Sequence, residues 1–259
     1  MIFDCHVHLP SPGLDYTWEW EKFTPDVDAA INYLQRCGVD KIVANSVRGE
    51  LATSVDEMVA ANDEIVEIAK DHPGYVVPAC LINTNFHQAA LNELRRCYDE
   101  LNIVWIGELC GYASGYTYET PAFTDAMQLA DELNMVVHIH NDNPQDIDRL
   151  CREFPNITFV LAHLGDSPEE VRERVDLTKR HLKLHLDISG HGYQRMGILE
   201  QAVRVAGADR VLFGSDYTIN DPAGVIARLD KSNFDVETRE KILGGNLARL
   251  LTEHGWDPE

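Results

Sequence analysis

The chain has 259 residues, of which 44% are hydrophobic, and this suits one large domain such as an α/β barrel of about 250 residues. The formal net charge of −21 repels a phosphate backbone, so composition argues against a nucleic-acid partner. No apolar run approaches the roughly 18 residues of a membrane span, no secretory leader pattern is visible, and the six cysteines form no CxxC pair, so we expect a cytoplasmic protein with reduced thiols and no membrane partner.

Eight short apolar runs, rich in β-branched residues, predict strands. They cover residues 1–9, 41–47, 75–83, 104–110, 135–140, 157–165, 182–189 and 210–216. Segments with helical apolar periodicity lie between and after them, at 26–38, 55–74, 87–102, 121–134, 144–156, 168–181, 196–208, 222–231 and 237–255. Strict alternation predicts parallel strands joined by right-handed crossovers. We therefore expect an α/β fold, a (β/α)8 TIM barrel forming a single domain over residues 1–259. An open doubly wound sheet is the alternative, but no GxGxxG motif follows the first strand.

Ionisable residues recur inside these runs, at or near the carboxyl ends of the predicted strands. In chain order they are Asp4, His6, His8, Glu108, His138, His140, His163, His185, Asp187 and Asp216. The carboxyl ends of barrel strands meet at one face, where barrel enzymes place their active sites. Burying so many ionisable groups is costly without compensation, and imidazole and carboxylate groups are ligands of Zn²⁺, Mn²⁺ and Fe²⁺. The pattern predicts a divalent metal at this mouth.

The histidines differ in what their spacing indicates. His6 and His8 lie two residues apart on one face of a buried strand, which favours a shared role as ligands. Of His138 and His140, the outer His140 is the better ligand, and His138 is either a packed residue of the core or a residue that supports a ligand. For His185 and Asp187 the pattern leaves a place in the site wall and a structural role equally open.

At this point the sequence resembles the amidohydrolase superfamily, and more narrowly the amidohydrolase-related branch of metal-dependent TIM-barrel hydrolases. The resemblance rests on "DCHVH", "MVVHIH", "FVLAHLG", "LFGSDY" and "KILGGNLARLL", and it covers nearly the whole chain. It implies that His6, His8, His140 and Asp216 bind metal. It also implies that His163 holds a second metal or orients the substrate, and that Asp4 supports the site.

Glu108 raises the question of a second ion. No lysine ends the fourth predicted strand, so a carbamylated-lysine bridge is not expected. Glu108 stands there instead, and it resembles the bridging position of TatD-like and some phosphotriesterase-like relatives. We expect Glu108 to be a metal ligand and leave one or two ions open, with Zn²⁺ favoured and Mn²⁺ or Fe²⁺ as alternatives.

The leading functional hypothesis is a metal-dependent hydrolase acting on a cyclic amide, lactone or ester through metal-activated water. Asp216 would take the proton from that water, and His163 would stabilise the oxyanion or hold a second metal. The alternative is a non-oxidative decarboxylase of a small carboxylated ring or related acid. A TatD-like nuclease and a non-catalytic metal-binding barrel rank lower.

The expected partner is a small-molecule substrate, selected by the loops that follow the strands. Two of these loops are rich in aromatic residues, namely Tyr16, Trp18, Trp20, Tyr112, Tyr116 and Tyr118. They fit either a lid over a planar substrate or the packing of the loops themselves. Arg48 and Arg195 are the cationic candidates for a substrate carboxylate, and a homodimer is left open.

Overall fold

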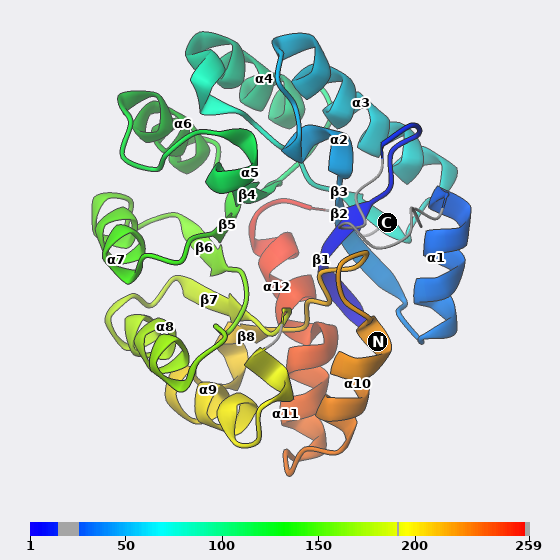
Figure 1. Ribbon diagram of the computed structural model, residues 1–259, viewed down its shortest axis with the longest axis vertical. Helices are drawn as coiled ribbons and strands as arrows, with labels where there is room; N and C mark the ends of the chain where they lie inside the picture. The colour runs from blue at the N-terminus through cyan, green and yellow to red at the C-terminus, as the bar shows by residue number, and fades with distance from the viewer. Residues whose placement is uncertain (15–25, 191, 257–259) are drawn as a thin grey trace.

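The computed structural model describes residues 1–14, 26–190 and 192–256. Eight strands lie in these ranges, each inside a predicted run, and helices surround them (Figure 1). The strands are β1 (Phe3–Leu9), β2 (Lys41–Ser46), β3 (Val76–Pro78), β4 (Trp105–Cys110), β5 (Val136–His140), β6 (Thr158–Leu161), β7 (Leu184–Asp187) and β8 (Val211–Leu212). β3 and β8 are short, so regular hydrogen bonding to the neighbouring strands extends over only a few residues in each.

The strands form a closed ring. Parallel ladders join β1, β2 and β3 in one sheet and β4 to β8 in another. Two isolated parallel bridges close the gaps, one between Cys80 and Ile106 and one between Val7 and Tyr217. This confirms the predicted (β/α)8 barrel and brings the first strand beside the end of the last.

The helices agree closely with the predicted segments. They are α1 (Val27–Arg36), α2 (Val47–Glu50), α3 (Val55–Asp71), α4 (His87–Asp99), α5 (Gly111–Ser114), α6 (Pro121–Glu132), α7 (Pro144–Glu153), α8 (Pro168–Arg180), α9 (Ile198–Ala206), α10 (Pro222–Asp230), α11 (Val236–Glu240) and α12 (Asn246–Glu253). The short helices α2 and α5, directly after β2 and β4, were not predicted. Across the described ranges, no helix combines the length and apolarity needed to cross a membrane.

The predicted last helix is divided. A π-helical turn, Lys241–Gly245, separates α11 from α12. A side chain at Gly244 would lie 3.0 Å from both the carbonyl oxygen of Met1 and Cβ of Phe3, so glycine permits the close approach of this turn to the first strand. The helical period in the sequence continues through this position and therefore does not reveal the break.

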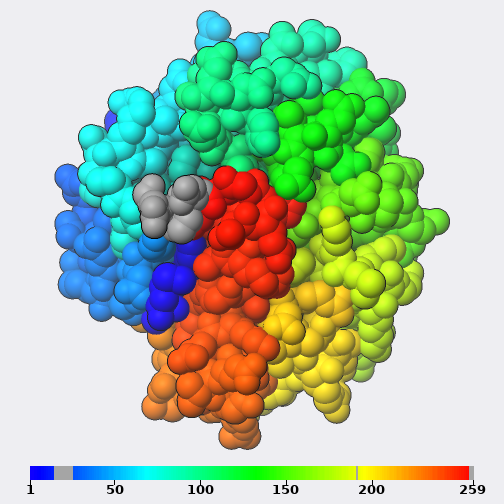
Figure 2. Space-filling model, turned by 180° about the vertical axis from the view of Figure 1, so that it is seen from behind, coloured from blue at the N-terminus to red at the C-terminus, as the bar shows by residue number. Residues whose placement is uncertain are grey.

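Side chains of alternate strand residues divide the core in two. Outward residues such as Val137 and Ile139 pack under the helices, whereas Val136 and Trp105 belong to a smaller inner cluster. Leu250 and Leu251 of α12 join that inner cluster, so α12 closes the amino-terminal end of the barrel. Figure 2 shows α12 crossing the middle of this face. The opposite end of the barrel remains as the place for the polar residues.

Candidate metal centre

His6 and His8 project from β1 towards the same point. The β1–β2 register shifts between Asp4 and Val7, and after the shift Nε2 of His6 lies 3.0 Å from Nε2 of His8. Asp4 does not join them. Its Oδ1 accepts hydrogen bonds from the backbone N–H groups of His6 (3.0 Å) and Ser215 (2.9 Å). These bonds join β1, which carries His6 and His8, to the segment after β8, which carries Asp216. Asp4 thus supports the site, as predicted, by binding the backbone of the segments that carry the other residues.

The other ring nitrogen of each histidine is already held. Nδ1 of His6 lies 2.8 Å from Oδ2 of Asp187, and Nδ1 of His8 contacts the buried carboxylate of Glu50. The side-chain amide of Asn45 lies 3.0 Å from the same His8 nitrogen. Metal-binding histidines commonly give their second N–H to a carboxylate in this way, which leaves Nε2 for the ion.

Glu108 and Asp216 complete a group of four donors, which we call the four-donor group. Glu108 Oε2 lies 3.1 Å from Nε2 of His6, and Asp216 Oδ1 lies 3.0 Å from Nε2 of His8. All four donor atoms lie within 4.8 Å of one another and all four residues are buried. β4 turns Glu108 inward at Gly107, which has a φ of 109° and where a Cβ would lie only 2.1 Å from the carbonyl oxygen of His138.

The four-donor group fits a divalent ion. Neighbouring donor atoms in it are 3.0–3.6 Å apart. Ligand atoms on bonds of about 2.1 Å lie ~3.0 Å apart at right angles and ~3.4 Å apart at the tetrahedral angle. Two carboxylates and two imidazole nitrogens converging at these separations, away from water, could hold a divalent cation between them.

The second oxygen of Glu108 faces a different set of donors. Oε1 lies 3.1 Å from Nδ1 of His140 and 3.6 Å from Nε2 of His163, and we call these residues the three-donor group. Behind them, Asp142 lies 3.6 Å from Nε2 of His140, and Ser189 Oγ lies 2.7 Å from Nδ1 of His163. The carboxylate of Glu108 therefore stands between two sets of atoms that could each bind a metal ion.

Asp187 connects the groups from behind. Its Oδ2 contacts both Nδ1 of His6 and Nε2 of His138 (2.9 Å), and its Oδ1 accepts the backbone N–H of His163 at 2.9 Å. Of the two roles left open for it, the structure thus gives Asp187 a place in the site. His138 is buried against it, as expected for a supporting residue.

The charged residues of the site shift one another's pKa values. Burial alone would raise the pKa of the Glu108 carboxyl, but the charge of His6 and the hydrogen bond with His140 hold it well below its usual value. Burial likewise lowers the pKa of His6, and the carboxylates of Glu108 and Asp187 reverse this and hold it well above. Burial lowers the pKa of His140 too, but hydrogen bonds with Asp142 and Glu108 raise it to about 9.

The pKa of His163 shifts the other way. Burial lowers it, with the charge of Glu108 only partly opposing the shift. His163 also has a left-handed backbone, with φ 65°, as does Asp216, with φ 62°. Few non-glycine residues adopt this conformation, and it persists where the surrounding contacts hold the backbone.

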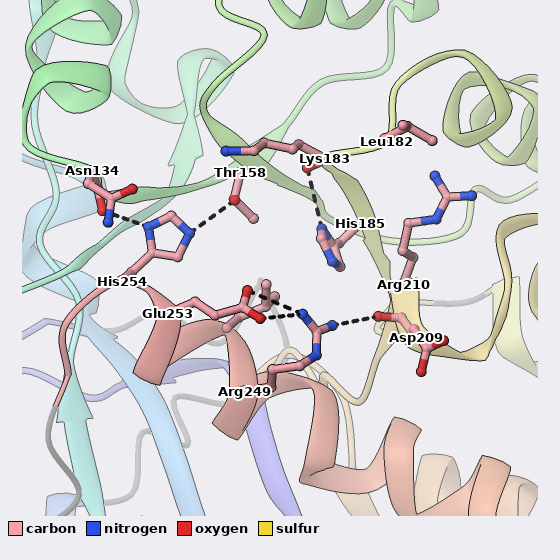
Figure 3. Close-up of a pocket in the computed structure, with 11 residues that line it drawn as sticks. Asn134, Thr158, Leu182, Lys183, His185, Asp209, Arg210, Arg249, Glu253 and His254 are labelled. Carbon is pink, nitrogen blue, oxygen red and sulfur yellow. Dashed lines mark hydrogen bonds and ion pairs between the residues drawn. The ribbon is translucent and has the colours of Figure 1, made fainter.

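His185 lies at the opposite end of the barrel and not in the metal centre. His185 lines a hollow of about 600 Å³. Figure 3 shows it there with residues that precede β5 to β8, such as Asn134 and Lys183, and with Arg249 and His254 of the carboxyl-terminal segment. Burial lowers its pKa to about 4. His185 and Asp187 lie two residues apart, so strand alternation places both on the same face of β7. The sequence alone therefore does not show that His185 lies at the amino-terminal end of the barrel and Asp187 at the metal centre.

The aromatic loop after β4 separates into two roles. Tyr116 is buried and stacks on Phe123, and Tyr118 donates a hydrogen bond to the carbonyl oxygen of Leu109, so these two pack the loop down. Tyr112 is 65% exposed, and its ring centroid lies 5.0 Å from that of His140. It therefore borders the site. Tyr16, Trp18 and Trp20 lie outside the described residues.

The two cationic candidates are placed differently from one another. Arg48 donates from Nε to Glu64 (2.9 Å) and from its guanidinium to the carbonyl oxygen of Pro12 (3.2 Å), so it is committed to structural contacts. Arg195 is exposed after β7. The sequence did not predict three residues that contact the site. They are Glu50 beside His8, Ser189 beside His163, and Arg174, which donates to the carbonyl oxygens of Ala162 and His163.

This chain belongs to the amidohydrolase family, since the family model described as Amidohydrolase matches residues 3–252. That confirms the resemblance inferred from the sequence. Among curated proteins, the γ-resorcylate decarboxylase of Rhizobium sp. is 22% identical over 249 residues, covering 75% of this chain and 76% of that protein. The 2-amino-3-carboxymuconate-6-semialdehyde decarboxylase of Dictyostelium discoideum is 24% identical over 285 residues, covering 90% and 77%.

Solved structures agree on the fold. A dihydroxybenzoic acid decarboxylase from Polaromonas sp., with bound manganese and the inhibitor 2-nitroresorcinol, superposes with a TM-score of 0.75 at 15% identity. The match covers 99% of each chain. At this identity the likeness establishes the barrel.

The prediction of a hydrolase is wrong. Both curated relatives are decarboxylases, which agrees with the alternative reading. The reason for the error is chemical, because the same ligands that would polarise a carbonyl for water attack can also bind a substrate carboxylate, and the motifs do not separate the two. An enzyme of the amidohydrolase superfamily with a buried group able to hold a divalent metal remains, and the preference for zinc finds no specific support beside a manganese-bound neighbour.

Proposed function

We propose that this chain is a metal-dependent, non-oxidative decarboxylase of a small carboxylated ring or a related unsaturated acid. The observation that carries the proposal is the four-donor group at the carboxyl ends of the strands, in a chain whose curated relatives decarboxylate such acids. Tyr112 beside His140 suits a planar substrate, because an aromatic ring can stack against it.

The metal would be held by His6, His8, Glu108 and Asp216, with Mn²⁺ or Zn²⁺ suited to these ligands. With one ion bound, the three-donor group would stay free to carry a proton. With two ions bound, it would hold the second, with Glu108 shared by both. When bound, a divalent ion supplies a positive centre for the substrate carboxylate and an adjacent oxygen.

The reaction breaks the bond between the ring carbon and the carboxyl carbon, releases CO2 and places a proton on the ring carbon. We assign the delivery of this proton to His163. Its lowered pKa makes the imidazolium a stronger acid than an exposed histidine. Ser189 Oγ donates to Asp187 Oδ1 and thus accepts from Nδ1–H of His163, so Nε2 is the atom that carries the transferable proton at the site.

The experiment is a CO2-release assay of the Mn²⁺-loaded protein with 2,6-dihydroxybenzoate and a panel of carboxylated phenols and unsaturated acids. We expect one CO2 and one decarboxylated product per substrate consumed. His163→Gln should lower kcat at least 100-fold while retaining the Mn²⁺ of the four-donor group. Metal-loaded protein that releases no CO2 from any member of the panel would contradict the proposal.

A further inference from the structure

A buried arginine on α8 joins the two strand ends that carry His140 and His163. Arg174 is only 5% exposed, although it lies on an outer helix of the barrel. One guanidinium nitrogen donates to the carbonyl oxygens of Ala162 (2.7 Å) and His163 (3.2 Å), at the end of β6. The other donates to the carbonyl oxygen of Asn141 (3.3 Å) and to Oδ1 of Asp142 (2.7 Å), after β5.

This arrangement differs from that of an ordinary helical arginine. Buried arginine is rare because removing the guanidinium from water is costly, and its planar fork makes it suited to fixing several oxygens at once. Arg172, two residues earlier on the same helix, instead pairs with Glu169 at the surface. The position of Arg174 is therefore specific to the carbonyl oxygens that it binds.

The His163 backbone shows why these contacts matter. Its conformation is left-handed, and its two backbone polar groups are held from opposite sides. Its N–H donates to Asp187 Oδ1 at 2.9 Å, while its carbonyl oxygen accepts from Arg174. With both peptide groups fixed, the imidazole is directed to Oε1 of Glu108, 3.6 Å from its Nε2.

Arg174 reaches His140 by a second route. The carboxylate of Asp142 lies between the two residues, 2.7 Å from the guanidinium and 3.6 Å from Nε2 of His140. The opposite nitrogen of His140 faces Glu108 Oε1 at 3.1 Å. One guanidinium thus contacts the segments that carry both histidines of the three-donor group. Within the described part of the chain, its hydrogen bonds do not reach His6, His8 or Asp216.

We infer that Arg174 is a positioning residue of the metal centre, which sets His140 and His163 against Glu108 through the strand-end backbone and through Asp142. The inference rests on the proposed function insofar as the three-donor group holds metal or proton. His6 and His8 are thus held by Asp187 and Glu50, whereas His140 and His163 depend in addition on Arg174 of α8.

The test compares Arg174→Gln and Arg174→Lys with Arg172→Gln, a matched control on the same helix. Histidine side-chain NMR signals are recorded on the metal-free proteins, with His140 and His163 assigned from His→Gln variants. Both Arg174 variants should shift these two signals and leave that of His254, at the far end of the barrel, in place. Arg172→Gln should shift none of them.

Mn²⁺ titration gives a second readout that a purely structural role would not change. We expect Arg174→Gln to weaken the binding of one Mn²⁺ equivalent at least tenfold at a temperature well below its Tm. Asp142→Asn, a change at a side chain that is 81% exposed, should weaken it in the same direction without loss of folding. Arg174→Lys should not restore binding, because an ammonium lacks the fork.

Arg174 variants with a lowered Tm but unchanged His140 and His163 signals would overturn the inference. So would unchanged signals in Asp142→Asn together with Arg174→Lys, even if Arg174→Gln failed to fold. These outcomes are independent of the CO2 assay, because a chain that released no CO2 would contradict the proposed reaction and leave the NMR comparison unaffected.

Discussion

Oδ2 of Asp187 lies 2.8 Å from Nδ1 of His6, between the end of the seventh strand and the middle of the first. Both groups are buried. Burial would raise the pKa of this carboxyl, but His6 and His138 hold it well below its usual value. An ionised carboxylate here favours a proton on Nδ1 of His6. Nε2 of His6 is then the nitrogen whose lone pair is available to the four-donor group.

Replacing Asp187 by Asn should therefore weaken Mn²⁺ binding by 10- to 100-fold, the usual effect of losing a carboxylate behind a metal-binding histidine. Titration of the metal-free protein measures the affinity, and circular dichroism checks the fold. Asp176→Asn on α8, an exposed site, is the control. An affinity within threefold of the wild type would show that the His6 tautomer does not depend on Asp187.

Glu108→Gln tests whether one carboxylate serves both donor groups. The amide keeps the shape but lacks the charge that two cations would share, so the number of Mn²⁺ ions bound per chain should fall by at least one. Metal analysis after equilibrium dialysis measures the stoichiometry. Glu237→Gln, at an exposed position on α11, should bind as the wild type does. A stoichiometry equal to that of the wild type would argue against a bridging role.

His185 makes a separable contribution to the pH dependence of stability. Burial lowers its pKa from about 6.5 to about 4, so the unfolded chain takes up the proton first as the pH falls. The contribution is complete above pH 6.5 and is lost between pH 6.5 and pH 4, and it amounts to about 3 kcal/mol.

Urea unfolding of wild type and His185→Gln at pH 7 and pH 4 measures this contribution. The wild type should lose about 3 kcal/mol more than the variant over that interval. Titration of the metal centre cancels in the difference between the two proteins. Equal losses in both would mean that His185 does not titrate as its burial requires.

Leu250→Ala should destabilise the barrel by about 2–5 kcal/mol, because it opens a cavity where α12 closes the amino-terminal end. Leu182 and Leu250 both line the hollow that contains His185, but Leu182 is 81% exposed. Leu182→Ala should therefore change the free energy of unfolding little. Mn²⁺ affinity should be unchanged in both, since the metal centre lies at the other end. Reduced affinity in Leu250→Ala would mean that the two ends are coupled.

Much of this centre was predictable because barrel geometry converts a strand-end position in the sequence into a place at one mouth. His6, His8, Glu108, His140, His163 and Asp216 all meet there as expected. Simple strand alternation does not describe how Asp4 lies relative to His6 and His8, since the β1–β2 register shifts between Asp4 and Val7. A shift of this kind depends on contacts with neighbouring strands and has no local signature.

The residues behind the ligands were harder to predict. Glu50 lies on a four-residue helix too short to leave a periodic pattern, and Arg174 reads as one more charge on a polar helix. Their roles arise from contacts that span 42 and 11 residues of the chain, from His8 to Glu50 and from His163 to Arg174. Only the folded barrel brings these side chains to their partners.

The bridge between Val7 and Tyr217 has a consequence for how the protein matures. His8 and Asp216 meet in the proposed ion site although 208 positions separate them in the chain. During translation the first strand leaves the ribosome long before Asp216 is made, so the nascent chain exposes two imidazoles without their carboxylate partner. At the proposed site, binding of an ion by all four ligands would therefore have to await synthesis of the segment that follows β8.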